Sequence, residues 1–293
     1  METFKDKTYK IGNAKITRVT ETLLMALTPE KLFADWDETV LDEYSRWLVL
    51  GHRQEKRRNV ILSVHTWIIE LDGKIILVDT GIGNDKIRPF SEMFHQLHTP
   101  YLVRLEAAGV KPEQVNHILL THLHTDHVGW NTRLMDGQWV PTFPNATYVF
   151  PDEERGFFMT PKGEARRMVF EDSVLPVIER ARTVAIGPEG GGYLDVFTFH
   201  PTPGHSPGHM SISMRTGGED VIFTGDVAHN PVQICRPEWV SVFCDEAERS
   251  CVSRKRLLDY AADRGALLFT AHFPETSVGI VKRKDSGFTW EYA

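Results

Sequence analysis

The stretch Thr121-His122-Leu123-His124-Thr125-Asp126-His127 decides the fold of this chain, because it gathers four metal-binding side chains within six residues. It directly follows an apolar strand that we expect over Val115–Leu120. Residues two apart in an extended segment project to the same side, so His122 and His124 can hold one ion. If the chain then turns into a helix, the Asp-His pair that follows points toward a neighbouring position. Imidazole and carboxylate groups are ligands that suit zinc and similar divalent ions.

Three later segments supply further candidate ligands, each at the carboxyl end of an expected strand. They are Thr202-Pro203-Gly204-His205-Ser206-Pro207-Gly208-His209, Phe223-Thr224-Gly225-Asp226 and Phe269-Thr270-Ala271-His272. Pro fixes φ and Gly permits unusual backbone angles in the first segment, so this loop can hold a side chain in place. Strand ends are a usual location for a site on a rigid scaffold. Spacing alone does not choose between His205 and His209.

Strands and helices are mixed in both halves of the chain, which predicts an α/β (α+β) fold of sheets covered by helices. Strands are expected over Val60–Leu71 and Lys74–Val78, joined by the turn Asp72-Gly73. The other expected elements are strands at 8–20, 115–120, 147–150, 194–200, 209–215, 220–224, 266–271 and 277–282, and helices at 99–109, 151–158, 164–182 and 249–263. Because no Pro-, Gly- or Ser-rich linker divides the chain, we expect one domain over residues 1–293, with an insertion at 23–58.

The four motifs, in this order, resemble those of the metallo-β-lactamase superfamily. The resemblance runs from Val60 to His272 and includes the turn Val78-Asp79-Thr80-Gly81 ahead of the metal motif. It implies an αββα sandwich, with two mixed sheets face to face, helices outside and metal ions at one edge. It also implies a metal-bridging hydroxide as the nucleophile, so no Ser or Cys nucleophile is needed.

The same resemblance implies two divalent metal ions per chain. Zinc is the first expectation, although nitrogen and oxygen ligands accept Mn, Fe or Co as well. The implied ligands are His122, His124 and His205 for one ion, Asp126, His127 and His272 for the other, and Asp226 as the bridge. His209 and Asp79 would then orient ligands instead of binding metal.

Asp126 and His229 are the candidates for moving protons. His229 lies in the segment Asp226-Val227-Ala228-His229-Asn230-Pro231-Val232-Gln233. Many lactonases of the superfamily place a Tyr at this position, where it contacts the substrate. A His followed by a Gln is instead similar to the branch of methyl-parathion-hydrolase-like enzymes. This departure weakens a direct transfer of the lactonase mechanism.

The composition of the chain limits the classes of binding partner and the cellular locations that we expect. The formal net charge of −7 argues against general nucleic-acid binding, which needs clustered Lys and Arg. The opening segment METFKDKTYKIG has no apolar signal-peptide core, and no stretch approaches the roughly 18 apolar residues of a membrane span. We therefore expect a soluble, cytoplasmic protein without membrane contact. The three cysteines are an odd number and form no disulfide framework.

These features favour a hydrolase of a small-molecule lactone or another carboxylic ester, similar to N-acyl-homoserine lactonases. The alternative is an organophosphate or aryl-ester hydrolase. A thioesterase fits less well because only 21 residues follow His272, and a non-catalytic ligand sensor fits less well because the ligand set is intact. Aromatic residues within 23–58 and 129–170 are candidates to wall a substrate pocket, and those of the insertion are candidates for a homodimer interface.

Overall fold

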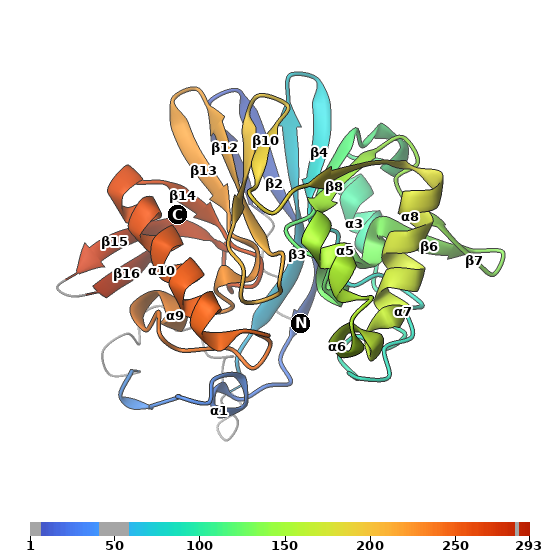
Figure 1. The fold of residues 1–293 in the computed structure, drawn as a ribbon. Helices are drawn as coiled ribbons and strands as arrows, with labels where there is room; N and C mark the ends of the chain where they lie inside the picture. Colours follow the sequence, from blue (N-terminus) through green and yellow to red (C-terminus); the bar gives the residue numbers. More distant parts are fainter. Residues whose placement is uncertain (1–6, 41–58, 285–286) are drawn as a thin grey trace. The chain divides into compact units, whose positions relative to one another are not determined.

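The computed structural model describes residues 7–40, 59–284 and 287–293. The chain divides into two compact units. Of the described residues, the N-unit contains 7–22 and 64–191, and the C-unit contains 23–40, 59–63, 192–284 and 287–293. Each unit has its own large sheet and its own buried cluster (Figure 1).

The N-unit sheet has seven strands in the order β1-β2-β3-β4-β5-β8-β9. Their bounds are β1 Thr8–Ile11, β2 Ala14–Leu24, β3 Leu62–Leu71, β4 Lys74–Val78, β5 His117–Leu119, β8 Thr147–Pro151 and β9 Arg182–Ile186. The turn Asp72-Gly73 joins β3 to β4 with φ of 48° and 74°, the backbone that Asp-Gly hairpins favour. Strands β4, β5, β8 and β9 are parallel, so their carboxyl ends lie at one edge of this sheet. The metal motif follows β5 at that edge.

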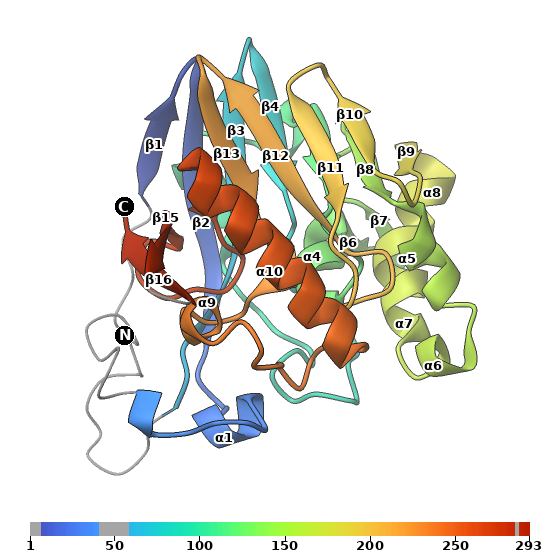
Figure 2. The same cartoon turned by 60° about the vertical axis from the view of Figure 1, so that its left-hand side comes forward.

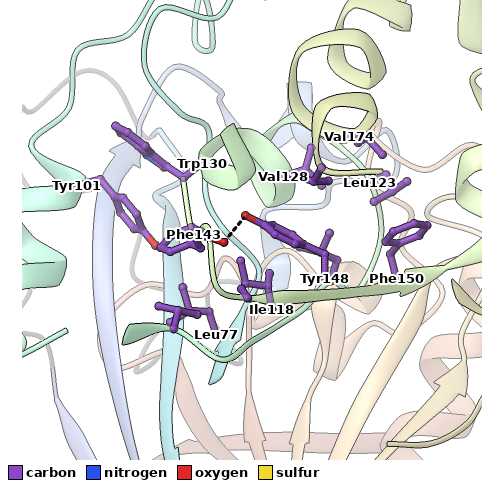
Figure 3. Close-up of a cluster of buried hydrophobic side chains, with 14 of the residues drawn as sticks. Leu77, Tyr101, Ile118, Leu123, Val128, Trp130, Phe143, Tyr148, Phe150 and Val174 are labelled. Atoms are coloured by element: carbon purple, nitrogen blue, oxygen red, sulfur yellow. Dashed lines mark hydrogen bonds between the residues drawn. The ribbon is translucent and has the colours of Figure 1, made fainter. Parts of the chain in front are cut away.

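The N-unit also contains helices and a small hairpin. They are α3 Tyr101–Ala107, η1 Pro112–Gln114, α4 Thr125–Val128, η2 Gly129–Asn131, α5 Asp152–Phe157, α6 Pro161–Glu164, α7 Arg167–Val169, η3 Phe170–Val174 and α8 Leu175–Arg180, with β6 Thr132–Met135 paired to β7 Gln138–Pro141. Leu77, Ile118 and Tyr148, from three neighbouring strands, belong to one buried cluster with Leu123 and Val128 (Figure 3). Since Leu123 and Val128 are buried, they anchor the backbone that carries the motif histidines.

The C-unit sheet also has seven strands, in the order β10-β11-β12-β13-β14-β15-β16. Their bounds are β10 Gly191–Tyr193, β11 Phe197–Pro201, β12 Met210–Thr216, β13 Glu219–Phe223, β14 Leu267–Phe269, β15 Val278–Lys284 and β16 Gly287–Tyr292. The pair β13–β14 is parallel, whereas β11–β12, β12–β13, β14–β15 and β15–β16 are antiparallel. Asp226 and His272 therefore follow two parallel neighbours at the same edge.

Helix α10 (Ala247–Arg264) runs diagonally across the strands of this sheet (Figure 2). Its residues Leu258 and Ala261 share a buried cluster with Ile222 of β13 and Leu268 of β14. The helix ends at Arg264 and is capped by Gly265, whose left-handed backbone (φ 61°) lets its N–H donate to the carbonyl of Ala261. The unit also contains α1 Pro29–Leu32, η4 Gly225–Val227 and α9 Val232–Cys235.

The predicted fold class is confirmed, because both large sheets are mixed and each unit contains helices. Strand β4 has the predicted bounds, and α10 lies within two residues of the helix predicted at 249–263. The helix predicted at 164–182 is wrong as one element. It is interrupted by the π-helical turn η3, next to Pro176, which has no N–H for the helical ladder, and it ends at Arg180. The β-branched residues of 182–186 instead pair with β8 as β9.

Some elements were not predicted from the sequence, and some predictions stay untested. The hairpin β6–β7 turns at Asp136-Gly137, a signal that was present in the sequence and overlooked. Strand β16 was also missed. Residues 41–58 of the predicted insertion lie outside the described residues, and one domain over 1–293 stays a prediction. Within the described ranges, no helix has the length and apolar character of a membrane span.

Candidate metal centre

The predicted metal motif begins extended and ends helical. Strand β5 ends just before it, and α4 starts at Thr125 with His124 as its extended N-cap residue (φ −71°, ψ 160°). The ring centroid of His122 lies 4.6 Å from that of His124 and 4.1 Å from that of His127. Three imidazoles of the motif are thus close neighbours, and the Asp126 carboxylate lies 4.0 Å from His127 Nε2.

Asp79 fixes the orientation of two of these rings. Its Oδ2 lies 2.9 Å from His127 Nδ1, so this nitrogen donates to the carboxylate. The hydroxyl of Thr121 also donates to Asp79 Oδ2, at 2.9 Å, and lies 3.0 Å from His122 Nδ1. Since the hydroxyl hydrogen is used on Asp79, His122 Nδ1 donates to Thr121. In both rings Nε2 is therefore the atom that can bind a metal.

The C-unit brings three imidazoles to one carboxylate, that of Asp226. Nε2 of His272 lies 3.0 Å from Oδ1, while Nε2 of His205 and His229 lie 3.2 Å and 3.4 Å from Oδ2. Ligand atoms of His205, Asp226 and His229 all lie within 4.8 Å of one another, which is close enough to share an ion. His229 was predicted only as a proton carrier, so its place beside two predicted ligands is new.

The loop before His205 approaches α10 closely. Gly204 has φ of 126°, and a Cβ at this position would lie 2.1 Å from the backbone nitrogen of Ser250. Any other side chain would therefore push the loop away from the helix. Ser253 of α10 also donates to the carbonyl of Pro203 at 2.6 Å. Together these contacts fix the position from which His205 reaches Asp226.

His209, the alternative to His205, has protein partners at both ring nitrogens. Nδ1 lies 2.9 Å from Thr202 Oγ1, and Nε2 accepts the backbone N–H of Asp226 at 2.8 Å. The ring therefore holds the backbone of Asp226 in place through this N–H. This arrangement agrees with the orienting role expected for His209.

His272 shows whether these donors suit a metal ion. Its Nδ1 lies 2.9 Å from the carbonyl oxygen of Ser63, which can only accept, so Nδ1 carries a hydrogen. In the neutral ring Nε2 then carries a lone pair, which faces the carboxylate of Asp226 at 3.0 Å. Lone pairs at this distance repel one another, and a divalent cation between them would turn the repulsion into binding. The chemistry of the donors therefore fits a metal.

Burial disfavours the charged form of His229 in this setting. Desolvation lowers the pKa of His229, and the neighbouring Asp226 opposes that shift. Its Nδ1 has no hydrogen-bond partner in the part of the chain that the structure describes. The backbone N–H of His229 donates to Gln233 Oε1 at 2.7 Å, and Gln233 donates to the carbonyl of Trp239 at 3.0 Å. The Gln of the sequence pattern thus anchors the backbone of His229.

A buried charge cluster that the sequence analysis did not identify supports the metal motif. The guanidinium of Arg88 donates to both carboxylate oxygens of Asp172, at 2.6 Å and 2.8 Å. Its Nε donates to the hydroxyl of Thr125, the first residue of α4, at 2.7 Å. Lys86 lies 3.5 Å from Asp172 and 3.6 Å from the ring centre of Trp139, and burial lowers its pKa to about 7. Arg88 and Lys86 are fully buried.

Glu21 is a second buried charge that was missed. Its carboxylate accepts the backbone N–H groups of Ile82 and Gly83, the indole of Trp130 and the hydroxyl of Thr99. Desolvation raises the pKa of Glu21, although these four donors oppose the shift. The carboxylate holds the loop that follows Asp79. None of these partners is near Glu21 in sequence, so no local pattern could have identified it.

Imidazoles and carboxylates at the strand ends of an α/β fold define a candidate metal-dependent enzyme. Residues 60–272 match the model of the Metallo-beta-lactamase superfamily, and the chain belongs to this superfamily. The family predicted from the four motifs is thereby confirmed.

The relatives include enzymes with named activities. N-acyl homoserine lactonase AttM of Rhizobium radiobacter is 26% identical over 182 residues, which cover 59% of this chain and 63% of that protein. The crystal structure of hydrolase AbOPH in the beta lactamase superfamily is 26% identical with a TM-score of 0.81, over 100% of this chain and 99% of that chain. AidC, a dizinc quorum-quenching lactonase in complex with a product, has a TM-score of 0.76 at 20% identity, over 98% and 97% of the two chains, and shows likeness of fold alone. The chain spans 58% to 63% of the length of the first curated relatives.

Proposed function

We propose that this protein is a metal-dependent hydrolase of a small-molecule lactone or another carboxylic ester. The proposal rests on one observation: three imidazole Nε2 atoms face the carboxylate of Asp226. The bond at His272 Nδ1 directs the Nε2 lone pair of that ring toward the same carboxylate. Membership of the superfamily and the lactonase relatives support the choice of reaction.

The proposed centre holds two divalent ions. Its ligands are those expected from the family: His122, His124 and His205 for one ion, Asp126, His127 and His272 for the other, and Asp226 between them. The order of the motifs in the chain and the family match support this assignment. The bonds at Nδ1 of His122, His127 and His272 support it further, since each leaves Nε2 as the metal-binding atom.

The bound ions would polarise the ester carbonyl and lower the pKa of a water molecule toward neutrality. The residues of the chain then have three tasks. Asp79 and Ser63 hold His127 and His272 in the tautomer that binds metal. His229, buried and with a lowered pKa, can accept a proton at Nδ1 or donate one after protonation. Asp126 is the other proposed group for returning a proton to the leaving oxygen.

An organophosphate or aryl-ester hydrolase is the second candidate. His229 favours it, because a His followed by Gln233 replaces the Tyr expected of many lactonases, and Gln233 bonds directly to the backbone of His229. The likeness to hydrolase AbOPH extends over the whole chain and is consistent with either substrate class.

Proton release from a long-chain N-acyl-homoserine lactone at neutral pH, with metal-replete protein, tests the proposal. We expect turnover in the wild type and a loss of at least about 100-fold in His122→Ala, more than removal of an orienting group usually costs. His98→Ala is the matched control, because His98 is exposed in the same unit. Turnover of a phosphotriester or aryl ester alone would establish the second candidate. Protein that binds no metal, and a lactone without turnover, would instead indicate a ligand sensor.

A further inference from the structure

A cavity of about 350 Å³ lies under α10, entirely within the C-unit. One side of it is a single face of the helix, with Ser253, Arg256, Leu257 and Tyr260 at the spacing of successive turns. The other side is formed by strands β11, β12 and β13, over which α10 runs in Figure 2. The volume lies in the range of small-molecule sites.

The interior of the cavity suits an apolar group. Ile222 and Leu257 line it with side chains that are 3% and 8% exposed. The hydroxyls in its wall are already engaged: Ser211 donates to the carbonyl of Thr224 at 2.8 Å, and the N–H of Ser211 donates to Thr202 Oγ1 at 2.9 Å. A polar guest would therefore gain few hydrogen bonds here, whereas an apolar guest would lose contact with water.

Aromatic rings and charged groups lie at the outer part of the cavity. The rings of His200 and Tyr260 are 6.4 Å apart, and Tyr260 is 39% exposed. Asp259 also lines the cavity, but Arg283 bonds to its carboxylate at 2.7 Å and so offsets its charge. Arg256 has no ion pair or hydrogen bond with any other described residue. The cavity thus combines an apolar interior with one guanidinium whose charge is not offset.

We propose that this cavity is a binding site for a small amphipathic carboxylate. Its apolar or aryl part would lie against Ile222, Leu257 and Tyr260, and its carboxylate would bond to Arg256, whose planar fork matches that group. The site is separate from the imidazoles around Asp226, because the ring of His209 stands between Thr202, in the cavity wall, and the backbone of Asp226. The inference does not depend on the proposed hydrolysis.

Calorimetric titration of the metal-replete chain with 4-phenylbutyrate, and with its uncharged amide, tests the proposal. We expect saturable binding of one equivalent of the acid. Arg256→Gln should lower the affinity for the acid about threefold to tenfold, in the range of a solvent-exposed ion pair to a charge-assisted bond. It should leave the affinity for the amide unchanged. Lys255→Gln is the matched control, because it removes the same charge from the adjacent exposed position outside the cavity. Tyr260→Ala should lower the affinity for both the acid and the amide.

Either of two results would overturn the site. One is the absence of saturable binding of the acid to the wild type. The other is equal affinity of Arg256→Gln and Lys255→Gln for the acid, which would place the probe elsewhere, including at the metal centre. Both substitutions change exposed side chains, so folding is not at risk. Because the titration reads binding and not turnover, its failure is distinct from a failure of the proposed function.

Discussion

The carboxylate of Asp79 contacts two residues of the metal motif, Thr121 and His127. Asp79 sits at φ 54°, a left-handed conformation that Asp and Asn tolerate better than other side chains. From there it accepts hydrogen bonds from the backbone and hydroxyl of Thr121 and from His127 Nδ1. Its negative charge makes His127 Nε2 a better electron donor to a metal.

Asp79→Asn should lower metal affinity about tenfold to 100-fold, the usual cost of changing a group that orients a ligand. Asn keeps the shape and the tolerated backbone, but it removes the charge that fixes the tautomer of His127. Competition with a chromophoric chelator measures the change. Asp85→Asn is the control, since Asp85 also has positive φ (63°) and is only partly buried in the same unit. Equal affinities of the two variants would contradict the role of Asp79.

At this scale local sequence pattern indicates the candidate ligands but not the buried side chains that contact them. Ligands such as His122 and Asp226 stand at the ends of apolar strands, where local pattern reveals them. Arg88 was not identified, because its partners Thr125 and Asp172 are 37 and 84 residues away in sequence. A buried ion pair becomes visible only once the tertiary fold brings its members together.

Among the elements, the short helix α4 depends on support from outside its own sequence. It has four residues and no side-chain N-cap bond, so it is too short to be stable by itself. The Arg88–Thr125 bond and the Asp172 carboxylate behind it hold its first turn. We therefore expect the geometry of Asp126 and His127 to depend on Arg88.

Arg88→Met should lower both stability and metal affinity. The lost bonds should cost about 1–3 kcal/mol, because the hydroxyl of Ser173 still donates to the Asp172 carboxylate at 2.6 Å. Metal affinity should fall about tenfold, because α4 loses its support. Arg104→Met is the control: Arg104 donates to the carbonyls of Thr20 and Glu21, away from the motif. Urea unfolding and chelator competition give the two quantities. A metal affinity no lower than that of Arg104→Met would assign Arg88 to stability alone.

The same cluster predicts a pH dependence of stability. Burial lowers the pKa of Lys86 from 10.5 to about 7, so between these values the unfolded chain binds a proton that the native chain does not. The unfolding free energy should therefore rise with pH above about 7, by up to about 1.4 kcal/mol per pH unit from this group. Lys86→Met should reduce the rise between pH 7 and 9, and Lys111→Met, at an exposed position, should not. Identical slopes for all three proteins would show that Lys86 is charged in the native state.

At the scale of the whole molecule, the predicted ligands belong to both units. His122, His124, Asp126 and His127 lie in the N-unit, and His205, Asp226 and His272 lie in the C-unit. The sequence indicated one shared centre through its resemblance to the superfamily, whereas strand pattern alone could not tell one centre from two. The metal content of a ligand variant separates these alternatives. Removal of a bridging ligand affects both ions, whereas removal of a ligand of a separate site affects only one.

Under the proposed bridging assignment, Asp226→Ala should release both proposed ions, lowering metal content from about two per chain to less than one. The unfolding temperature of the variant should also become insensitive to added zinc, since a ligand stabilises only the protein that binds it. Asp220→Ala controls for the loss of a carboxylate, because Asp220 lies on β13, the strand that precedes Asp226, and pairs with Arg215 and Arg264. Metal analysis after gel filtration gives the stoichiometry. If Asp226→Ala still held one ion tightly, the N-unit ligands would form a site without Asp226, and the bridging assignment would have to be abandoned.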